Sequence, residues 1–473
     1  MNKATELDTQ IQATTEEVDI IRSSDEILAA IGLNYATVRG MKPGEKRASY
    51  QAVINWLTEY QVNSNVSNLE KVKGLLETFF HLCGVLDWEK GNKILFIQLN
   101  TPTKEELHWQ LQTWGFYTEQ INLYKRLLGK LNSSLDVIFL RGLGMAYECL
   151  AEYSKAVEHY QQSLSIARSI NSSTGIGSAL GNLGNVYCSL GKYNQAIEHY
   201  QKLLDIAQKI GDRATEGGTL GNLGIAYKCL GKYNKAIDYY QQLWNIAREL
   251  EDPFGEGKAL TNLGNIYDFR GEYHQAINCY KQSLKVAQKI GDIAEEGLVL
   301  NNLGNTYNFL TEYTQGIEYL KLSWKIARKI KDSIGEIAVL VNLGNTYFLR
   351  KDYNEAINYY KQALILTQKT GDSRGEGIAL YNLGSTLLKD DKFLEALEYL
   401  QAALEVFRRI NSCYYEAEVL NSLAKIYLDL GNHHIANECC TKGLAIAIEL
   451  EIPLAQECQE LMEKIKYNEQ QKN

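Results

Sequence analysis

Apolar residues recur at helical spacing through most of the chain, and the same pattern returns every forty residues. In one copy, Leu180, Leu183, Gly184 and Tyr187 occupy positions i, i+3, i+4 and i+7, which form one face of a helix. Glycine costs a helix about 1 kcal/mol relative to alanine. The pattern therefore predicts a first helix whose glycines serve close packing against neighbouring helices rather than local helix stability.

A second amphipathic segment follows each of these helices. After a turn at Gly191 and Lys192, the apolar face is made by Tyr193, Ala196, Ile197, Tyr200, Leu203 and Leu204. We predict that this helix runs to about Ile210. Gly211 then suits a left-handed C-terminal cap, and Asp212 suits the N-cap of the next helix.

The helix pair repeats in a constant register. A leucine precedes each copy, at positions 140, 180, 220, 260, 300, 340, 380 and 420. A period in this range indicates a solenoid, in which each unit buries its apolar face only against its neighbours.

The residues of the repeat resemble a known family. Gly184, Tyr187, Ala196 and Tyr200 match the signature of the tetratricopeptide repeat (TPR), which is about 34 residues long. The longer unit, with Leu-Gly-Asn at 183–185, 263–265, 303–305 and 343–345, is similar to the repeats of LGN-type proteins and kinesin light chains. The resemblance covers about residues 137–450 and implies an all-α fold, a right-handed TPR solenoid.

The same comparison within the chain predicts five segments. They are a disordered tail (1–24), a helical N-terminal cap (25–66), two degenerate TPR-like units (67–136), eight regular units (137–452), and a C-terminal capping helix with a frayed tail (453–473). We expect that last helix to begin at Pro453 and to end near Tyr467. The segment before the array resembles the N-terminal part of multi-repeat TPR proteins from cyanobacteria.

Composition narrows the class of partner. The chain has 49 Lys and Arg against 57 Asp and Glu, a net charge of −8, which argues against a nucleic-acid or anionic-membrane partner. No apolar run approaches the roughly 18 residues of a membrane span. The acidic start lacks the apolar core of a signal peptide, and nine cysteines without a Cys-x-x-Cys pair indicate a reducing compartment. We therefore expect a cytoplasmic protein.

Candidate chemistry is sparse. His433, His434, Cys439 and Cys440 cluster, but their spacing fits no helical pair of metal ligands. The glycine-rich segments contain no G-x-x-x-x-G-K-[ST] phosphate loop. Of the 31 tyrosines, 18 recur at three positions of the repeat, which Tyr187 (first helix), Tyr193 (turn) and Tyr200 (second helix) occupy in one copy. We expect the tyrosines of these three columns to be core. The sequence therefore predicts no enzyme, no cofactor and no metal.

The TPR resemblance implies that the first helices line a concave groove. Asparagines fill its expected positions, before the Leu-Gly pair at Asn182, Asn222, Asn262, Asn302, Asn342 and Asn382, after it at Asn185, Asn265, Asn305 and Asn345, and beside it at Asn301 and Asn308. An amide both donates and accepts hydrogen bonds, so this ladder suits the backbone of an extended peptide. Apolar pockets for anchor side chains are expected near Phe269, Phe309, Phe348 and Tyr381.

An alternative is that these asparagines bridge adjacent units. For the asparagines before the Leu-Gly pair, ligand contact and bridging between units are equally supported. For the asparagines after the pair, we favour ligand contact. TPR proteins that bind chaperone tails clamp a carboxylate with five residues. Asn185, Asn222 and Lys258 match three of those positions, but Gly181 and Asn262 replace two basic ones. We therefore expect a protein or peptide ligand other than a chaperone tail.

These features predict a scaffold or adaptor for protein partners. A second hypothesis is a peptide-gated transcription regulator with a helix-turn-helix at residues 25–40. There, Gly32 and Val38 have the spacing of that motif, and basic side chains follow at Arg39, Lys42, Lys46 and Arg47. The regulator should bind DNA in a salt-dependent way, and the scaffold should not.

Overall fold

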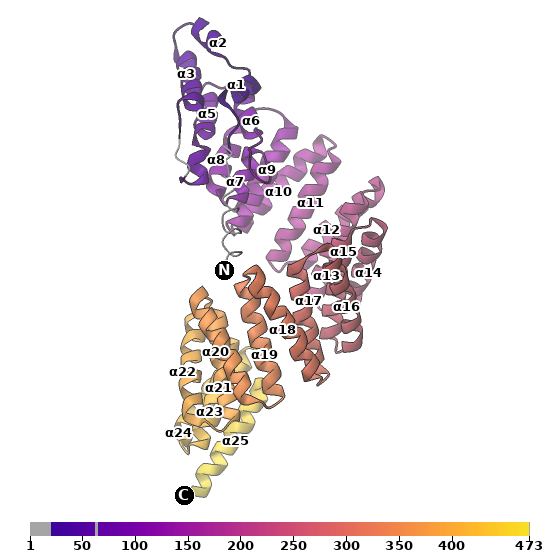
Figure 1. Ribbon diagram of the computed structural model, residues 1–473, viewed down its shortest axis with the longest axis vertical. Helices are drawn as coiled ribbons and strands as arrows, with labels where there is room; N and C mark the ends of the chain where they lie inside the picture. The colour runs from indigo at the N-terminus through magenta and orange to yellow at the C-terminus, as the bar shows by residue number, and fades with distance from the viewer. Residues whose placement is uncertain (1–19, 62–64, 473) are drawn as a thin grey trace, which may run out of the picture. The chain divides into compact units, whose positions relative to one another are not determined.

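The computed structural model of the chain describes residues 20–61 and 65–472. The described residues form helices, shown in chain order in Figure 1. The described residues also contain an isolated antiparallel β-bridge between Gln98 and Glu106. The predicted all-α solenoid fold is confirmed.

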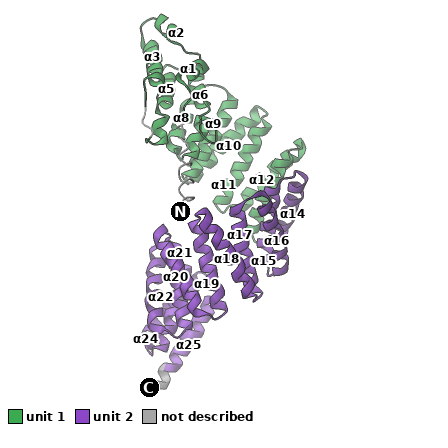
Figure 2. Cartoon of the chain, in the orientation of Figure 1, with its two compact units in different colours: residues 1–232 green, residues 233–473 purple. Residues whose placement is uncertain are grey.

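The chain divides into two compact units, residues 1–232 and 233–473 (Figure 2). The described part of the first unit contains helices α1 (Ser24–Ile31), α2 (Tyr35–Gly40), α3 (Glu45–Thr58), α4 (Asn68–Lys71), α5 (Lys73–Gly84), α6 (Trp88–Leu95), α7 (Leu107–Thr113), α8 (Tyr117–Leu127), α9 (Ser133–Cys149), α10 (Tyr153–Ser169), α11 (Ser173–Ser189), α12 (Tyr193–Ile210) and α13 (Arg213–Cys229). From α9 onward, odd-numbered helices are the first helices of repeat units and even-numbered helices are the second.

The described part of the second unit continues the alternation. Its helices are α14 (Tyr233–Glu249), α15 (Pro253–Phe269), α16 (Tyr273–Ile290), α17 (Ile293–Phe309), α18 (Tyr313–Ile330), α19 (Ser333–Leu349), α20 (Tyr353–Thr370), α21 (Ser373–Lys389), α22 (Phe393–Arg409), α23 (Cys413–Asp429), α24 (His433–Glu449) and α25 (Leu454–Lys472). Within each unit, every helix of the regular repeats packs on the next, from α9 to α13 and from α14 to α25, and successive first helices also contact one another, for example α9 with α11 and α17 with α19.

The predicted punctuation between repeats is confirmed. Helix α12 ends at Ile210, and Gly211 follows with φ 72° in the left-handed region that glycine favours. The side chain of Asp212 then accepts a hydrogen bond from the Thr215 amide and caps α13. Pro253 opens α15, where its missing N–H has no helical partner to lose.

The two ends of the chain differ from prediction. Residues 1–19 of the predicted tail lie outside the described residues. Arg22 donates to the Gln98 carbonyl at 3.1 Å, and the Asn100 amide donates to the Ile20 carbonyl at 2.9 Å, so the expectation of disorder is wrong for the described part of that tail. At the other end α25 runs to Lys472, beyond the predicted stop at Tyr467.

The repeat glycines make room for aromatic rings. A Cβ atom on Gly184 would lie 2.3 Å from the Tyr200 ring, and one on Gly344 would lie 2.4 Å from the Tyr360 ring. Tyr200 and Tyr360 are both 2% exposed. The first helix of a unit therefore presents a notch into which the second-helix tyrosine packs, as expected from the sequence.

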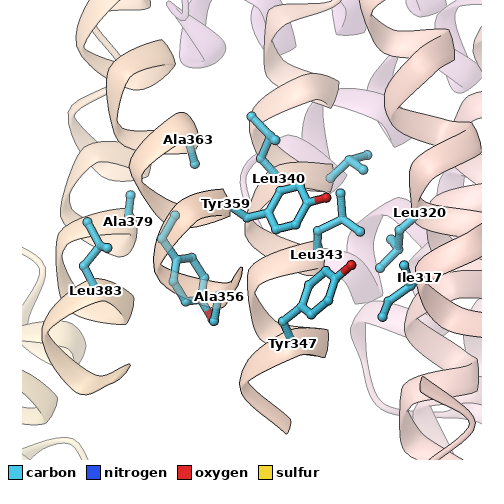
Figure 3. Packing of buried hydrophobic residues seen from close by; sticks show 12 residues of the cluster. Ile317, Leu320, Leu340, Leu343, Tyr347, Ala356, Tyr359, Ala363, Ala379 and Leu383 are labelled. Carbon is cyan, nitrogen blue, oxygen red and sulfur yellow. The ribbon is translucent and has the colours of Figure 1, made fainter. Parts of the chain in front are cut away.

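Two of the three tyrosine columns form the core, and the third does not. The second-helix tyrosines are buried, and those of the first helices are buried or half-buried, as Tyr347 is against Tyr359 at a ring-centroid distance of 5.3 Å (Figure 3). The tyrosines that open the second helices are half-buried, so the prediction that they are core is wrong. Tyr273, for example, stacks on the exposed Phe309 at 5.2 Å. These rings cover the edge of each unit, where solvent reaches one side.

Glutamates near the start of the first helices tie successive units together. Glu216 accepts from the Gln208 side chain at 3.0 Å, and Glu376 accepts from Gln368 at 3.1 Å. Glu336 does the same with the Trp324 indole at 3.0 Å. These glutamates therefore connect the second helix of one unit to the first helix of the next.

A buried histidine anchors the helix pair α7 and α8. The Tyr124 hydroxyl lies 2.7 Å from His108 Nδ1, and Glu106 lies 2.9 Å from Nε2. Burial, with a smaller contribution from the Arg141 charge, lowers the pKa of His108 to about 4. The imidazole is therefore neutral at pH 7, and its Nδ1 accepts a hydrogen bond from the Tyr124 hydroxyl while its Nε2–H donates one to the Glu106 carboxylate.

This histidine predicts an acid sensitivity of the first unit. The pKa of His108 is lower folded than unfolded, so the unfolded chain binds the extra proton, and stability is full above about pH 6.5 and falls toward pH 4. Between pH 7 and pH 5 the free energy of unfolding should drop by about 2 kcal/mol through His108. Urea unfolding at both pH values tests this against His108→Gln, since His159 and His199 are also shifted downward in pKa. Equal pH slopes in variant and wild type would contradict it.

Candidate partner-binding surface

The asparagines that follow the Leu-Gly pair share one arrangement. The Tyr200 hydroxyl donates to Asn185 Oδ1 at 2.7 Å, Tyr280 donates to Asn265 Oδ1 at 2.7 Å, and Tyr360 donates to Asn345 Oδ1 at 2.6 Å. Because the oxygen faces the core tyrosine, the Nδ2 group points the other way. Among the described residues no acceptor is recorded for these three Nδ2 groups. The core thus orients a column of amide donors.

Asn305 belongs to the same column but lacks the tyrosine. Leu320 occupies the position of Tyr280 and Tyr360, and no side-chain hydrogen bond of Asn305 is recorded within the described chain. Its side chain is half-buried on the same helix face. It is the member of the column whose removal disturbs the fewest internal contacts.

Some asparagines before the Leu-Gly pair bridge units. Asn302 Nδ2 donates to Asn265 Oδ1 at 3.1 Å, and Asn342 Nδ2 donates to Asn301 Oδ1 at 2.9 Å. Asn262 instead donates to the Lys258 carbonyl of its own helix at 3.0 Å. The bridging geometry supports a structural role for this column in the second unit. In contrast, no side-chain bond is recorded in the described chain for the half-buried members, which are Asn182, Asn222 and Asn382.

Asn308 lies inside the repeat. It is 8% exposed, and its Nδ2 donates to Thr346 Oγ1 of the next unit at 2.7 Å. A Cβ atom on Gly316 would lie 2.5 Å from Asn308 Oδ1, so the glycine makes room for this amide where most other units have alanine. Asn308 is therefore separated from the asparagines that follow the Leu-Gly pair.

The aromatic candidates lie along the edge of the same helix faces. Phe269 and Phe309 are 71% and 61% exposed and follow Asn265 and Asn305 by one helical turn. Phe269 packs on Tyr233 at a ring-centroid distance of 5.0 Å. Each ring is therefore held by a neighbour while its other face is open to an apolar side chain.

The remaining candidates are more enclosed or lie apart. Phe348 is half-buried with its ring 5.8 Å from that of Tyr353. Tyr381 is half-buried and donates to Glu418 at 3.3 Å; burial, and next the Glu418 charge, raise its pKa to about 12. Lys258 is exposed, with its ammonium 4.1 Å from the Phe254 ring centroid.

The first unit contains a cavity of about 580 Å³ beside the asparagines of α11. Asn182 and Asn185 line it together with Arg141 of α9 and Trp109 of α7. The prediction from sequence included the two asparagines and missed the other pair. An arginine on the first-helix face, where Gly181 and Gly221 stand in the next two copies, was the available signal.

The cysteine and histidine cluster near residue 440 is part of the packing. Cys440 is buried, and its thiol donates to the Cys458 carbonyl at 3.1 Å. No group of three or more potential metal ligands is brought together within the described residues. None of the helices in the described ranges is both long and apolar enough to cross a membrane.

Residues 25–40 form two short helices around Gly32, which has φ 69°. Helix α2 has six residues, contains the buried Val38, and contacts α3. Arg47 donates to the Met41 carbonyl at 3.3 Å, and Lys46 lies 5.8 Å from the Tyr50 ring centroid. These basic groups are engaged within their own segment, so DNA binding stays a prediction from the sequence.

Comparison with known proteins matches this architecture. Tetratricopeptide repeat models match residues 140–172, 175–249, 219–289, 295–369 and 376–449. The degenerate units predicted at 67–136 lie before these matches and stay a prediction. No curated protein matches the chain in sequence.

Solved structures show the same fold. One is a Signal Transduction ATPase with Numerous Domains protein with a tetratricopeptide repeat sensor from Pyrococcus horikoshii (15% identity, 91% of this chain and 66% of that chain, TM-score 0.56). A second is the apo form of the quorum sensor NprR from B. thuringiensis (14% identity, 80% and 99%, TM-score 0.51). At these identities the likeness concerns the fold alone.

Proposed function

Because this chain belongs to the tetratricopeptide repeat family, we propose that it is a protein-interaction scaffold that binds an extended segment of a partner protein along the first helices of its repeats. The observation that carries the proposal is the set of oriented amides on the first helices, with Asn185 in the first compact unit and Asn265 and Asn345 in the second. Each presents Nδ2 away from a core tyrosine that holds the other end of the amide.

The column suits backbone recognition. A peptide in extended conformation presents carbonyl oxygens at regular intervals, and amide donors bind them regardless of side-chain identity. Orientation by the tyrosine hydroxyls reduces the entropy lost when a ligand is bound. Phe269 and Phe309, one turn from their asparagines, offer open ring faces to apolar side chains. The amides would supply affinity for the peptide backbone, and the phenylalanine rings would supply a preference for apolar side chains.

The decisive experiment is affinity capture from source-cell lysate with wild type and a triple variant, Asn265→Ala, Asn305→Ala and Asn345→Ala. Each lost hydrogen bond is worth about 1 kcal/mol, so the affinity of the captured partner should fall by about 100-fold in the triple variant. The single Asn305→Ala variant should lose about fivefold without loss of thermal stability, because no internal bond of this side chain is recorded in the described chain.

A matched control keeps the result specific. Asn245→Ala, Asn278→Ala and Asn358→Ala remove three amides from the second helices, and this variant should capture the partner as the wild type does. Circular dichroism and thermal unfolding establish that all variants are folded. If the first-helix variant retains every partner, the proposed surface is wrong and the asparagines serve the repeat stack alone.

A further inference from the structure

Arg141 carries a positive charge that forms no ion pair with any carboxylate of residues 20–61 and 65–472. Its side chain is half-buried on α9, and its Nε atom is buried with no hydrogen-bond acceptor in the described chain. The guanidinium lies over the Trp109 ring at 5.1 Å from the centroid. A buried donor on a charged group costs free energy unless a partner satisfies it.

The polar groups around Arg141 are hydrogen-bonded to partners other than the arginine. His108 is neutral at pH 7, so it adds no negative charge, and Glu106 is hydrogen-bonded to it at 2.9 Å. The hydroxyl of Tyr124 is taken by His108 and Gln120, and that of Tyr160 donates to Glu148. These polar atoms satisfy one another, and the arginine is left facing the cavity.

The cavity is open because its wall residues are small. Gly177, Ser178 and Gly181 line it, and together with Asn182 and Asn185 they leave about 580 Å³. The same place in a later repeat, bounded by Gly297, Leu298 and Asn301, holds about 110 Å³. The larger side chains at positions 298 and 301 account for part of the difference. Near Arg141 the repeat is thus hollowed beside an unpaired cation.

We infer that this cavity binds a single carboxylate group, the side chain of an aspartate or glutamate in the extended partner segment, through the guanidinium of Arg141. The inference rests on the proposed function and adds the chemistry of one ligand position. Arginine pairs with carboxylates in a bidentate geometry, and Trp109 holds the plane of the guanidinium. The amides of Asn182 and Asn185 line the same space.

Asp212 restricts the ligand further. Its carboxylate also lines the cavity and accepts hydrogen bonds from the Thr215 amide and hydroxyl, at 3.0 and 2.7 Å. A second negative charge nearby repels polyanions such as a phosphorylated or nucleic-acid ligand. A ligand with a single carboxylate is attracted by the Arg141 guanidinium and is repelled least by the Asp212 carboxylate.

A random library of 12-residue peptides selected on the full-length chain tests the inference. The wild type should select peptides with Asp or Glu at one fixed position relative to their apolar residues. Arg141→Gln should lose that preference and bind a selected peptide about 10- to 100-fold more weakly, the loss expected for a charged hydrogen-bonded pair. The Glu→Gln peptide should bind the wild type equally weakly and should lose nothing further in Arg141→Gln.

Two further variants separate the site from general effects. Arg168→Gln removes an exposed arginine of α10 and should select the same peptides as the wild type. Ser178→Leu introduces the residue that stands at the equivalent position 298, narrows the cavity and should weaken acidic peptides. The thermal midpoint of Arg141→Gln should lie only slightly below that of the wild type, because the side chain loses its contact with the Trp109 ring but has no internal hydrogen bond in the described chain.

The outcomes distinguish the inference from the proposed function. Wild-type selection of peptides without an acidic preference overturns the carboxylate site and leaves the scaffold function standing. Failure of the wild type to select any peptide overturns the peptide-binding proposal. Acetate is then the probe: a rise in thermal midpoint that Arg141→Gln abolishes supports a carboxylate site filled by a small molecule, and no rise overturns the site.

Discussion

Replacing Tyr360 with alanine is expected to destabilise the second compact unit by about 4 kcal/mol. The side chain is 2% exposed, packs in the notch above Gly344, and donates to Asn345 Oδ1 at 2.6 Å. Truncating a buried aromatic residue typically costs about 3–5 kcal/mol, because contacts are lost and a cavity remains. The first helix cannot close that cavity without moving the units on both sides of it.

Hydrogen exchange of the α19 and α20 amides measures this change in free energy of opening. Tyr353→Ala is the matched control: that tyrosine is half-buried at the unit edge, so its loss should cost about 1 kcal/mol. Tyr360→Phe should cost about 1 kcal/mol, since only the hydroxyl bond is lost. Similar costs for Tyr360→Ala and Tyr353→Ala would refute the division into buried and edge columns.

Two glycine-to-alanine substitutions in the first unit should change stability in opposite directions. In Gly184→Ala the new Cβ would lie 2.3 Å from the buried Tyr200 ring, so ring and helix must separate. We expect a loss of about 3 kcal/mol, at the upper end for overpacking of a core. In Gly218→Ala the Cβ meets no atom of the described chain within 4 Å, so the variant should gain about 1 kcal/mol of helix propensity.

Both glycines lie in first helices of adjacent repeats, which makes the comparison a test of packing rather than of composition. Urea unfolding followed by far-UV circular dichroism should shift to lower urea for Gly184→Ala and to higher urea for Gly218→Ala. A stabilising effect at both positions would mean that the Tyr200 notch is loose and that propensity governs the glycines.

The candidate site was predictable in part. Periodicity placed Asn265 and Asn345 at one equivalent position of the first helices, because residues forty apart occupy equivalent positions in successive units. It gave no sign that Asn308 turns inward to Thr346, since that contact depends on the small Gly316 in a different helix. Periodicity did not single out Arg141, because the Trp109 ring under its guanidinium lies in α7, before the regular repeats.

The sequence alone determined the repeat, its register, the two helices of each unit and their caps. These depend on local propensity and on a forty-residue period that any stacking of units must keep. Only the tertiary structure decided which end of each amide faces the core, which tyrosines are edge rather than core, and where a cavity remains. Those outcomes depend on side chains from separate helices meeting at atomic distances, and helical periodicity specifies a face without specifying its neighbour.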